Sequence, residues 1–441
     1  MIAKPSRVGS LCLIFGLLAA GTFWIIQESA PLEPIVALAA DGEQKWFKGN
    51  LHTHSHWSDG NDYLESIAKW YRDREYDFLA FTDHNVLARS ERWIDVEKSK
   101  GGREAYDKLK ANFPEPGWVE ERQSPEGRLE VRLRTFPEVF DKMAIPNKFL
   151  LIQGEEISDR FGNSPIHMNV SNVETAIPPL GGKSVTDAMQ NNVNAVIAQR
   201  ERTGRPMLIH LNHPNFHYGI TAEDIYPVIG ENFFEVYNGH PHVHNSGDHV
   251  HASTEVIWDI VNTLRLTQTN LPLMYGLGTD DGHEYHNIPS TGSNPGRGWV
   301  MVLARELTPE ALITALEQGH FYASSGVELT EVRHDAQGIT VTPKVIDGVT
   351  YQFDFIGTQK GIDPKGEPVL DEQGHPLPVT KKYPKGVGAT FKTMKGASGS
   401  YEFTGDELYV RCRITSSRRH PNPSEHNEYE RAWTQPVRPG L

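Results

Sequence analysis

The chain has 441 residues, of which 23% are charged and 38% are hydrophobic, as in an ordinary globular protein. Its net charge of −14 and the lack of a basic run argue against a protein that wraps duplex nucleic acid, because such a protein must neutralise many phosphates. A small phosphorylated substrate stays compatible with this charge, since bound divalent metals would reverse the local potential. The length predicts one large domain and a smaller one.

The N-terminal segment has the pattern of an export signal. Lys4 and Arg7 precede an apolar run over residues 8–26, and no acidic residue occurs before Glu28. This charge bias holds the N-terminus in the cytoplasm and sends the rest across the membrane. The run is just long enough to span a bilayer, so it fits either a cleaved signal peptide or an uncleaved anchor in the inner membrane. We therefore expect a periplasmic or extracellular protein that meets the membrane only through this segment.

Two histidines follow the first expected strand at a spacing that suits metal binding. Residues 46–51 predict a short buried strand, and His52 and His54 follow it directly. Side chains two apart on a strand point the same way, so two neutral imidazoles can bind one metal ion. Asp59 adds a carboxylate from the loop that leaves the strand. Because this pattern also arises by chance at a polar strand end, the interpretation depends on whether further ligands occur later in the chain.

Later strands are also followed by possible metal ligands. Strands are expected over residues 76–81, 148–153, 206–211, 233–237 and 273–277. The side chains that follow them are His84, Glu155 and Glu156, His213, His240, and then Asp280, Asp281 and His283. His167 begins another short strand. The recurrence of this arrangement favours a shared metal site over isolated, solvated histidines.

The strands alternate with helical patterns, which predicts an α/β fold. Helices are expected over residues 63–74 and 185–203 and from Thr308 to Gly319. Seven or eight strands alternating with helices are typical of a (β/α) barrel, whose functional residues gather at the C-terminal ends of its strands. The charged stretch 88–147 interrupts this pattern. It predicts a partly helical surface insertion, either a lid over the site or a decoration without a role.

The C-terminal part has a different pattern. From about residue 335, apolar and polar residues alternate between turns rich in glycine and proline, which is typical of an antiparallel β domain. The polar stretch 417–430 is expected to be a loop, and Cys412 is the only cysteine of the exported part. We therefore divide the chain into an N-terminal signal peptide or anchor (1–44), a barrel with its insertion (45–330) and a small β domain (331–441).

Five motifs together resemble the polymerase and histidinol phosphatase (PHP) superfamily. They are His-Thr-His with Ser-Asp-Gly at 52–60, Thr-Asp-His at 82–84, Gly-Glu-Glu-Ile at 154–157, Asn-His-Pro at 212–214 and Asp-Gly-His at 281–283. The resemblance covers about residues 46–330. It is strongest to the exported branch with a C-terminal β domain, related to enzymes that hydrolyse phosphate or carbamate esters. It implies a distorted (β/α)7-type barrel, followed here by a small antiparallel β domain, and three divalent metals.

The resemblance also implies a ligand role for nine residues. The first metal would be held by His52, His54, Glu156 and Asp281, the second by Asp59, His84 and His283, and the third by Glu156, His167 and His213. Glu156 would bridge two metals. Asp280 and Asp281 are alternative ligands, and the Asp-x-His spacing favours Asp281. Glu155 and Glu156 are alternatives as well, and the isoleucine that follows favours Glu156. His167 has no strong local motif, so the third metal is the least well defined.

Metal chemistry follows from the ligand types themselves. Mixed histidine and carboxylate ligands suit Zn, Mn or Fe better than Mg or Ca, and we expect roughly two to three such ions. Metals about 3.5–4 Å apart can share a bridging hydroxide and clamp the attacking and leaving oxygens of a displacement. Glu156, Asp281 and His283 would then act in catalysis through the metals. No Gly-x-Ser-x-Gly motif supports a serine nucleophile.

Two residues outside the ligand set are candidate substrate contacts. His240 opens a run of five histidines that ends at His251. Arg297 precedes an expected strand and could bind an anionic group through two parallel hydrogen bonds. The alternatives are a solvated loop for the histidines and a surface salt bridge for Arg297.

The sequence thus predicts an exported metal-dependent hydrolase that acts through a metal-bridging hydroxide on a small-molecule phosphoester. One alternative is hydrolysis of a carbamate or carboxylic ester at the same metals. Another is a non-catalytic surface binding protein with structural metals, although structural sites usually close with fewer ligands. Oligomeric state and metal identity are left open.

Overall fold

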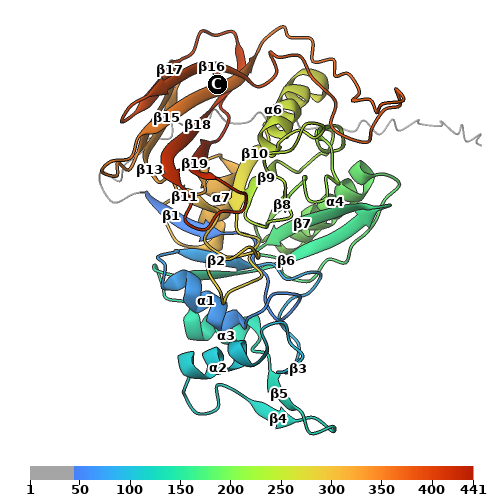
Figure 1. Cartoon of the computed structure of the whole chain (residues 1–441), viewed down its shortest axis with the longest axis vertical. Coiled ribbons are helices and arrows are strands. Elements are labelled where there is room, and N and C mark those ends of the chain that lie inside the picture. The colour runs from blue at the N-terminus through green and yellow to red at the C-terminus, as the bar shows by residue number, and fades with distance from the viewer. Residues whose placement is uncertain (1–43, 441) are drawn as a thin grey trace, which may run out of the picture. The chain divides into compact units, whose positions relative to one another are not determined.

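Seven strands carry or lead into the predicted site residues in the computed structural model, which describes residues 44–440. The expected export segment lies outside these residues. The seven strands are β1 (Lys45–Asn50), β2 (Phe78–Phe81), β6 (Leu150–Phe161), β7 (Ser164–Ser171), β8 (Leu208–Leu211), β9 (Phe233–Asn238) and β10 (Tyr275–Thr279). They lie side by side in the order β10-β9-β8-β7-β6-β2-β1 (Figure 1).

The two ends of this series meet beside the predicted ligands. Thr53, beyond β1, forms an isolated parallel bridge with Gly282, beyond β10. The backbone N–H of His54 donates to the carbonyl oxygen of Gly282 at 3.0 Å. β10 itself pairs only with β9 among the described strands, so a regular closed barrel is not confirmed. The structure shows a mixed α/β fold with a large sheet and few helices.

The strand directions also depart from the expected alternation of strand and helix. β1, β2 and β6 are parallel, and so are β8, β9 and β10. β7 is antiparallel to both of its neighbours. The two-residue turn at Gly162 and Asn163 joins it directly to β6 and so reverses the chain. The expected end of the strand at Gln153 is therefore wrong. Glu156 lies within β6, opposite Asn169 of β7.

Most of the described helices pack against strands that they follow or precede. They are α1 (Leu64–Arg72), α2 (Gly102–Asn112), α3 (Phe136–Met143), α4 (Val185–Thr203), α5 (Ala222–Ile225), α6 (Thr254–Leu264) with a π-helical turn at Arg265–Thr269, and α7 (Pro309–Glu317). α4 has the bounds that the sequence predicts: the Ser184 hydroxyl caps the N–H of Asp187, and Gly204 ends the helix at φ 65°. α1 contacts β2, α4 contacts β6 and β7, and α6 contacts β9.

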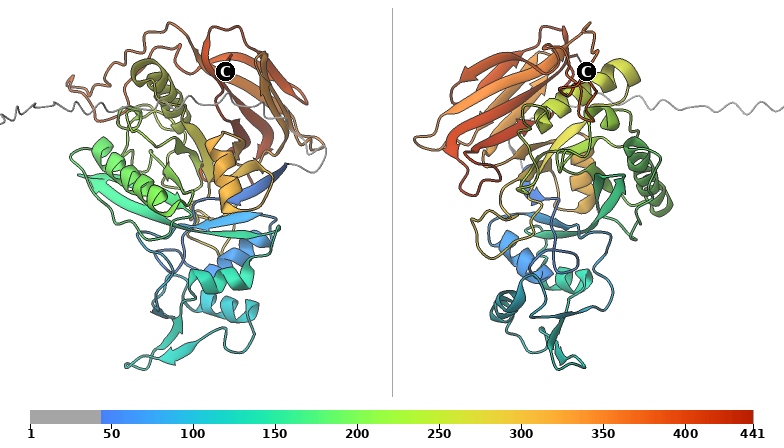
Figure 2. Two further views of the ribbon diagram at one scale, coloured as in Figure 1. Left: turned by 180° about the vertical axis from the view of Figure 1, so that it is seen from behind. Right: turned by 45° about the vertical axis from the view of Figure 1, so that its right-hand side comes forward.

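The insertion 88–147 is built from α2, α3 and a small antiparallel sheet. Its strands are β3 (Trp93–Asp95), β4 (Glu121–Gln123) and β5 (Leu129–Arg132), in the order β3-β5-β4. α2 and α3 both contact α1. Leu64 and Ile67 of α1 share one buried cluster with Ala105, Leu109 and Val139 of the insertion. Figure 2 shows this part of the molecule from two further sides.

The main sheet continues into the C-terminal part and reaches thirteen strands. The remaining strands are β11 (Trp299–Ala304), β12 (Phe321–Ser324), β13 (Leu329–Asp335), β14 (Gly338–Pro343), β15 (Tyr351–Gln359), β16 (Ala389–Lys395), β17 (Gly399–Glu402), β18 (Glu407–Arg419) and β19 (Tyr429–Thr434). Beyond β1 the order is β11-β12-β19-β18-β15-β16, and β13, β14 and β17 form a separate sheet. The expected loop 417–430 is shorter than predicted, because β18 runs to Arg419 and β19 begins at Tyr429. Among residues 44–440, no helix combines the length and apolar character needed to span a membrane.

Candidate metal centre

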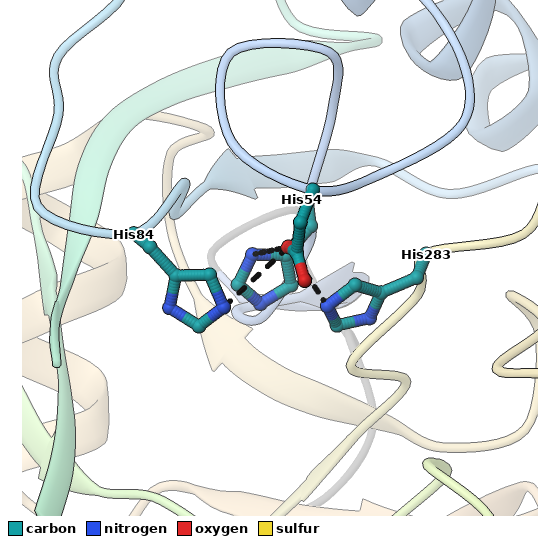
Figure 3. Close-up of side chains that lie close together, drawn as sticks. His54, His84 and His283 are labelled. Atoms are coloured by element: carbon teal, nitrogen blue, oxygen red, sulfur yellow. Dashed lines mark ion pairs between the residues drawn. The ribbon is translucent and has the colours of Figure 1, made fainter. Parts of the chain in front are cut away.

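All nine predicted ligands lie together where the segments after β1 and β10 meet. They form four overlapping groups in which possible ligand atoms lie within 4.8 Å of one another. The groups are His54, Asp59, His84 and His283; His52, His54 and Glu156; His52, His213 and Asp281; and His84, Glu156 and His167. Figure 3 shows the rings of His54, His84 and His283 around one carboxylate. Oδ1 of Asp59 lies 3.7 Å from Nδ1 of His54, 3.4 Å from Nε2 of His84 and 3.2 Å from Nε2 of His283.

Glu156 occupies the centre of this arrangement. Its Oε1 lies 3.0 Å from Nδ1 of His167 and 3.6 Å from Nε2 of His213. Its Oε2 lies 2.7 Å from Nδ1 of His84 and 3.3 Å from Nε2 of His54. Burial raises the pKa of this carboxyl, but the surrounding histidines outweigh burial and hold it well below its usual range. An ionised carboxylate among four imidazoles suits a ligand shared between metals.

The buried polar atoms fit divalent metal ions. Nε2 of His52 and Nε2 of His54 face each other at 3.0 Å, and Oδ1 of Asp281 lies 3.2 Å and 3.3 Å from these two atoms. Oε2 of Glu156 is fully buried. Nδ1 of His84 lies 2.7 Å away, but Oε2 accepts no hydrogen bond of good geometry. Burial and the neighbouring His283 and His84 lower the pKa of His54 to about 3, which favours the neutral imidazole that metals bind.

Glu235 is a functional candidate that the sequence analysis missed. It lies on β9, fully buried, and its Oε1 is 2.6 Å from Nδ1 of His52. Its Oε2 accepts from the backbone N–H of His213 at 2.9 Å and from Nδ2 of Asn238 at 2.7 Å. A carboxylate on Nδ1 fixes the proton there and leaves Nε2 of His52 free for a metal. The available signal was one acidic residue within the apolar run 233–237.

The structure separates the two pairs of competing acidic residues. Asp280 accepts from the backbone N–H groups of Arg297 and Gly298 at 2.6 and 2.8 Å, so it supports the loop behind the cluster. Glu155 points away from the cluster and accepts from the N–H of Ile177 at 2.7 Å. Asp281 and Glu156, which the motifs favoured, are the members that lie among the histidines.

The insertion reaches the cluster at one point. Nζ of Lys100 lies 2.6 Å from the backbone oxygen of Asp59 and 3.4 Å from its Oδ2. Oδ1 of Asp59 faces the cluster, 3.2 Å from Nε2 of His283 and 3.4 Å from Nε2 of His84. The insertion therefore contacts a predicted ligand at the rim of the site.

His240 lies next to the cluster without joining it. Its ring centroid is 5.5 Å from that of His283 and 5.8 Å from that of Phe216. Nδ1 of His240 accepts from the N–H of His242 at 3.1 Å, so the neutral ring carries its proton on Nε2. Burial lowers the pKa of His240 to about 4; Asp281 opposes this change and His283 adds to it. Two other histidines of the run, His244 and His251, stack on Tyr218.

Arg297 is buried behind the site. Its side chain has 0% exposure and donates to the carbonyl oxygens of Gly239 at 2.7 Å, Ser290 at 2.9 Å and Asn422 at 3.2 Å. The alternative of a surface salt bridge is wrong, because the guanidinium is not at the surface and donates to carbonyl groups. A contact between Arg297 and a substrate stays a prediction.

No protein family model matches the chain. Among curated proteins, the DNA polymerase/3'-5' exonuclease PolX of Bacillus subtilis (strain 168) is 29% identical over 133 residues. These are 30% of this chain and 21% of that protein, so the match spans about one fifth of the relative's length.

Two bacterial proteins are among the solved structures that resemble this chain in part. One, from Bacteroides vulgatus ATCC 8482, is described as a two-domain protein containing a predicted PHP-like metal-dependent phosphoesterase. It is 16% identical to this chain, with a TM-score of 0.36. The match covers 90% of this chain and 96% of that one. PsfC from Pseudomonas syringae PB-5123 is 14% identical with a TM-score of 0.30, covering 63% and 88%.

Proposed function

We propose that this PHP-like chain is a metal-dependent hydrolase that acts on phosphoesters. The observation that carries the proposal is the position of Glu156, whose two carboxylate oxygens face four imidazoles within 3.6 Å. A purely structural metal site usually closes with about four ligands. Nine ligands in overlapping groups support several neighbouring ions and therefore favour catalysis over a structural role.

The residues around the metals have separate tasks. When bound, divalent ions would supply Lewis acidity and lower the pKa of water. Glu156 holds the centre of the cluster together, and Glu235 fixes the proton of His52 on Nδ1. His240 presents an Nε2–H beside His283, in a position suited to donate a hydrogen bond to an ester oxygen.

Charge balance favours a phosphate group over a neutral ester. Asp59, Glu156 and Asp281 carry three negative charges, whereas roughly two to three divalent ions would carry four to six positive charges. The difference is one to three positive charges. Counting Glu235 as well leaves zero to two. With three ions the site stays positive even when Glu235 is counted, and it then attracts an anionic substrate although the whole chain carries −14.

The relative PolX supports the same substrate class, because its name describes a 3'-5' exonuclease. A carbamate or carboxylic ester stays the second candidate, since the same metals could serve it. The proposed substrate is a small molecule, and metal identity among Zn, Mn and Fe rests on the mixed histidine and carboxylate ligands.

A substrate panel tests the proposal. The chain would be stripped of metal with a chelator, reloaded separately with Zn, Mn or Fe, and offered a phosphomonoester, a phosphodiester, an aryl carbamate and a carboxylic ester. We expect hydrolysis of a phosphoester that disappears on stripping and returns with at least one metal. Turnover confined to the carbamate or carboxylic ester would move the assignment to the second candidate. No metal-dependent turnover of any ester would overturn it.

We also propose that the chain is exported, with its hydrolase part on the outer side of the cytoplasmic membrane. The support is in the sequence: Lys4 and Arg7 precede the apolar run 8–26. Protease added to cells with an intact cytoplasmic membrane should then degrade the protein once it can pass any outer layer. Degradation that begins only after the cytoplasmic membrane is opened would contradict export.

A further inference from the structure

A polar cavity of about 200 Å3 lies apart from the metal cluster, between the start of α6 and the strands β18 and β19. Its lining includes Asn245 and Ser253 from the segment between β9 and α6, Glu255 of α6, Arg413 of β18, and Arg431 and Trp433 of β19. The proposed hydrolase function uses none of these side chains.

Three hydrogen-bond donors in this lining form no hydrogen bond of good geometry. Arg413 lies directly opposite Trp433 in the sheet, and Arg431 is two residues from Trp433, so the three side chains share one face. Nε of Arg413, Nε of Arg431 and Nε1 of Trp433 are buried and form no hydrogen bond of good geometry, although the carboxylate of Glu255 lies close to the Trp433 N–H. Trp433 is only 2% exposed. Buried donors without an acceptor are costly, so their common position indicates a ligand with acceptor atoms.

The start of α6 adds positive potential to the same cavity. Ser253 caps the helix by accepting from the N–H of Val256, and Thr254 and Glu255 begin its first turn at the lining. The N-terminus of a helix favours a negative group. The guanidinium of Arg431 forms no ion pair within residues 44–440, whereas Arg413 is paired with Glu255 at 3.2 Å and Asp354 at 3.0 Å. Arg431, Trp433 and the helix start therefore favour a carboxylate.

Acidic side chains lie on another part of the lining. Glu425 accepts from the N–H and the hydroxyl of Ser246, and Glu428 accepts from the N–H of Ser424 at 2.9 Å. Burial opposes ionisation of Glu255, but Arg411, Arg413 and Arg431, with help from the nearby Trp433 N–H, lower its pKa to about 2. The lining thus holds two arginines and three glutamates, a formal net charge of −1.

This balance disfavours a simple anion and suits a ligand with both charges. We propose that the cavity binds a small α-amino acid. Its carboxylate would face Arg431, Trp433 and the start of α6, and its ammonium group would face Glu425 and Glu428. The cavity volume limits the ligand to a short side chain. Asn245 of the lining is hydrogen-bonded to Asn238, which donates to Oδ2 of Asp281 at 3.2 Å, so the ligand would lie two residues from the metal cluster.

Calorimetric titration of the full chain tests this proposal without reference to hydrolysis. The probes are glycine, alanine and serine, with acetate and methylammonium as ligands that carry only one of the two charges. We expect at least one amino acid to bind, and acetate and methylammonium to bind at least tenfold more weakly. Trp433→Phe removes the indole N–H while keeping a ring, and Arg431→Gln removes the guanidinium charge near Glu255. Each should weaken binding about tenfold or more.

Arg419→Gln is the matched control, because Arg419 lies on β18 and stacks on Tyr429 outside the lining. It should bind like the parent. If Trp433→Phe fails to fold, Arg431→Gln decides alone. The proposal is overturned if none of the three amino acids binds at about 10 mM, if acetate binds as tightly as they do, or if Arg431→Gln binds like the parent.

Discussion

His52 owes its suitability as a ligand to Glu235. The 2.6 Å contact with Nδ1 holds the ring proton there and turns the Nε2 lone pair toward the cluster. Glu235→Gln keeps the shape of the side chain but weakens this control of the proton. We expect metal affinity to fall about 10- to 100-fold, with the fold retained. Competition with a metal-binding dye measures the affinity, and metal affinity equal to that of the parent would refute the role of Glu235.

His240 should separate metal binding from turnover. Its ring lies beside His283, but its Nδ1 already accepts from the backbone of His242, which leaves Nε2–H for a substrate. His240→Ala should keep the metal content of the parent and lower kcat about 10- to 100-fold, because one donor to the reacting group is lost. Elemental analysis and steady-state kinetics on the same preparation give both values. Loss of metal would instead make His240 part of the ligand set.

At the scale of residues, the clustering of the candidate ligands could be predicted because most of them lie next to strand ends and carry local motifs. Asp59, His84 and His283 are examples. Oδ1 of Asp59 lies 3.4 Å from Nε2 of His84 and 3.2 Å from Nε2 of His283. Glu235 could not be predicted in this way. It lies inside the apolar strand β9, and its partner His52 is 183 residues away in the sequence. No local pattern records that distant contact.

At the scale of elements, α1 contains a buried carboxyl whose ionisation opposes folding. Glu65 is 2% exposed and accepts from Nε1 of Trp118 in the insertion at 3.1 Å, while its second oxygen has no partner. Burial raises the pKa of Glu65 to about 7, above the value of 4.5 of the unfolded chain. The folded protein therefore holds this proton more tightly, and stability falls as pH rises from about 4.5 through 7.

Glu65→Gln should abolish this contribution. Between about pH 5 and pH 8.5, the parent should lose about 2–3 kcal/mol of unfolding free energy relative to the variant. Urea unfolding of both proteins at the two pH values measures the difference, in which all other titrations cancel. Glu402→Gln, at an exposed position of β17, is the control and should follow the parent. Equal pH dependence of parent and Glu65→Gln would show that Glu65 ionises normally.

The elements themselves were predicted with uneven success, for identifiable reasons. α4 matches its predicted bounds because a serine cap and a terminal glycine mark both ends. β6 extends beyond its predicted end because Glu155 and Glu156 resemble a polar loop, although pairing with β7 keeps them in the strand. Pairing between strands is a tertiary effect that composition does not show.

At the scale of the whole molecule, a buried ion pair joins α6 to the C-terminal strands. Arg411 of β18 donates to both carboxylate oxygens of Asp259, at 2.9 and 2.7 Å, and its guanidinium lies over Trp258. Both partners are at most 5% exposed. Arg411→Met leaves the carboxylate of Asp259 buried without its cation, which should cost about 3–5 kcal/mol of unfolding free energy.

The double variant Arg411→Met with Asp259→Leu provides the matched comparison. It removes both charges and should recover much of the loss, because apolar replacements of a buried pair are often tolerated. Urea unfolding of the parent, the two single variants and the double variant completes the cycle. A cost below about 1 kcal/mol for Arg411→Met would show that the pair does not hold these parts together.

The sequence divides into a barrel part and a β domain, but the main sheet continues through both parts. β12 pairs with β19, so the strands of both parts belong to one thirteen-stranded sheet. The antiparallel pattern of the C-terminal strands could be predicted from alternating residues. Which strand they join could not, because register and partner depend on contacts far apart in the chain.

Metal content and phosphoester hydrolysis, measured on the same preparations of the parent, Glu156→Gln and Glu155→Gln, test the central claim most directly. The two glutamates are adjacent on β6, but Glu156 faces the histidines and Glu155 faces Ile177. The parent should carry roughly two to three divalent ions per chain and hydrolyse a phosphoester. Glu156→Gln should lose metal and activity together, and Glu155→Gln should keep both. A parent with less than about one ion after metal-supplemented expression, or a Glu156→Gln variant with full metal and full rate, would contradict the account.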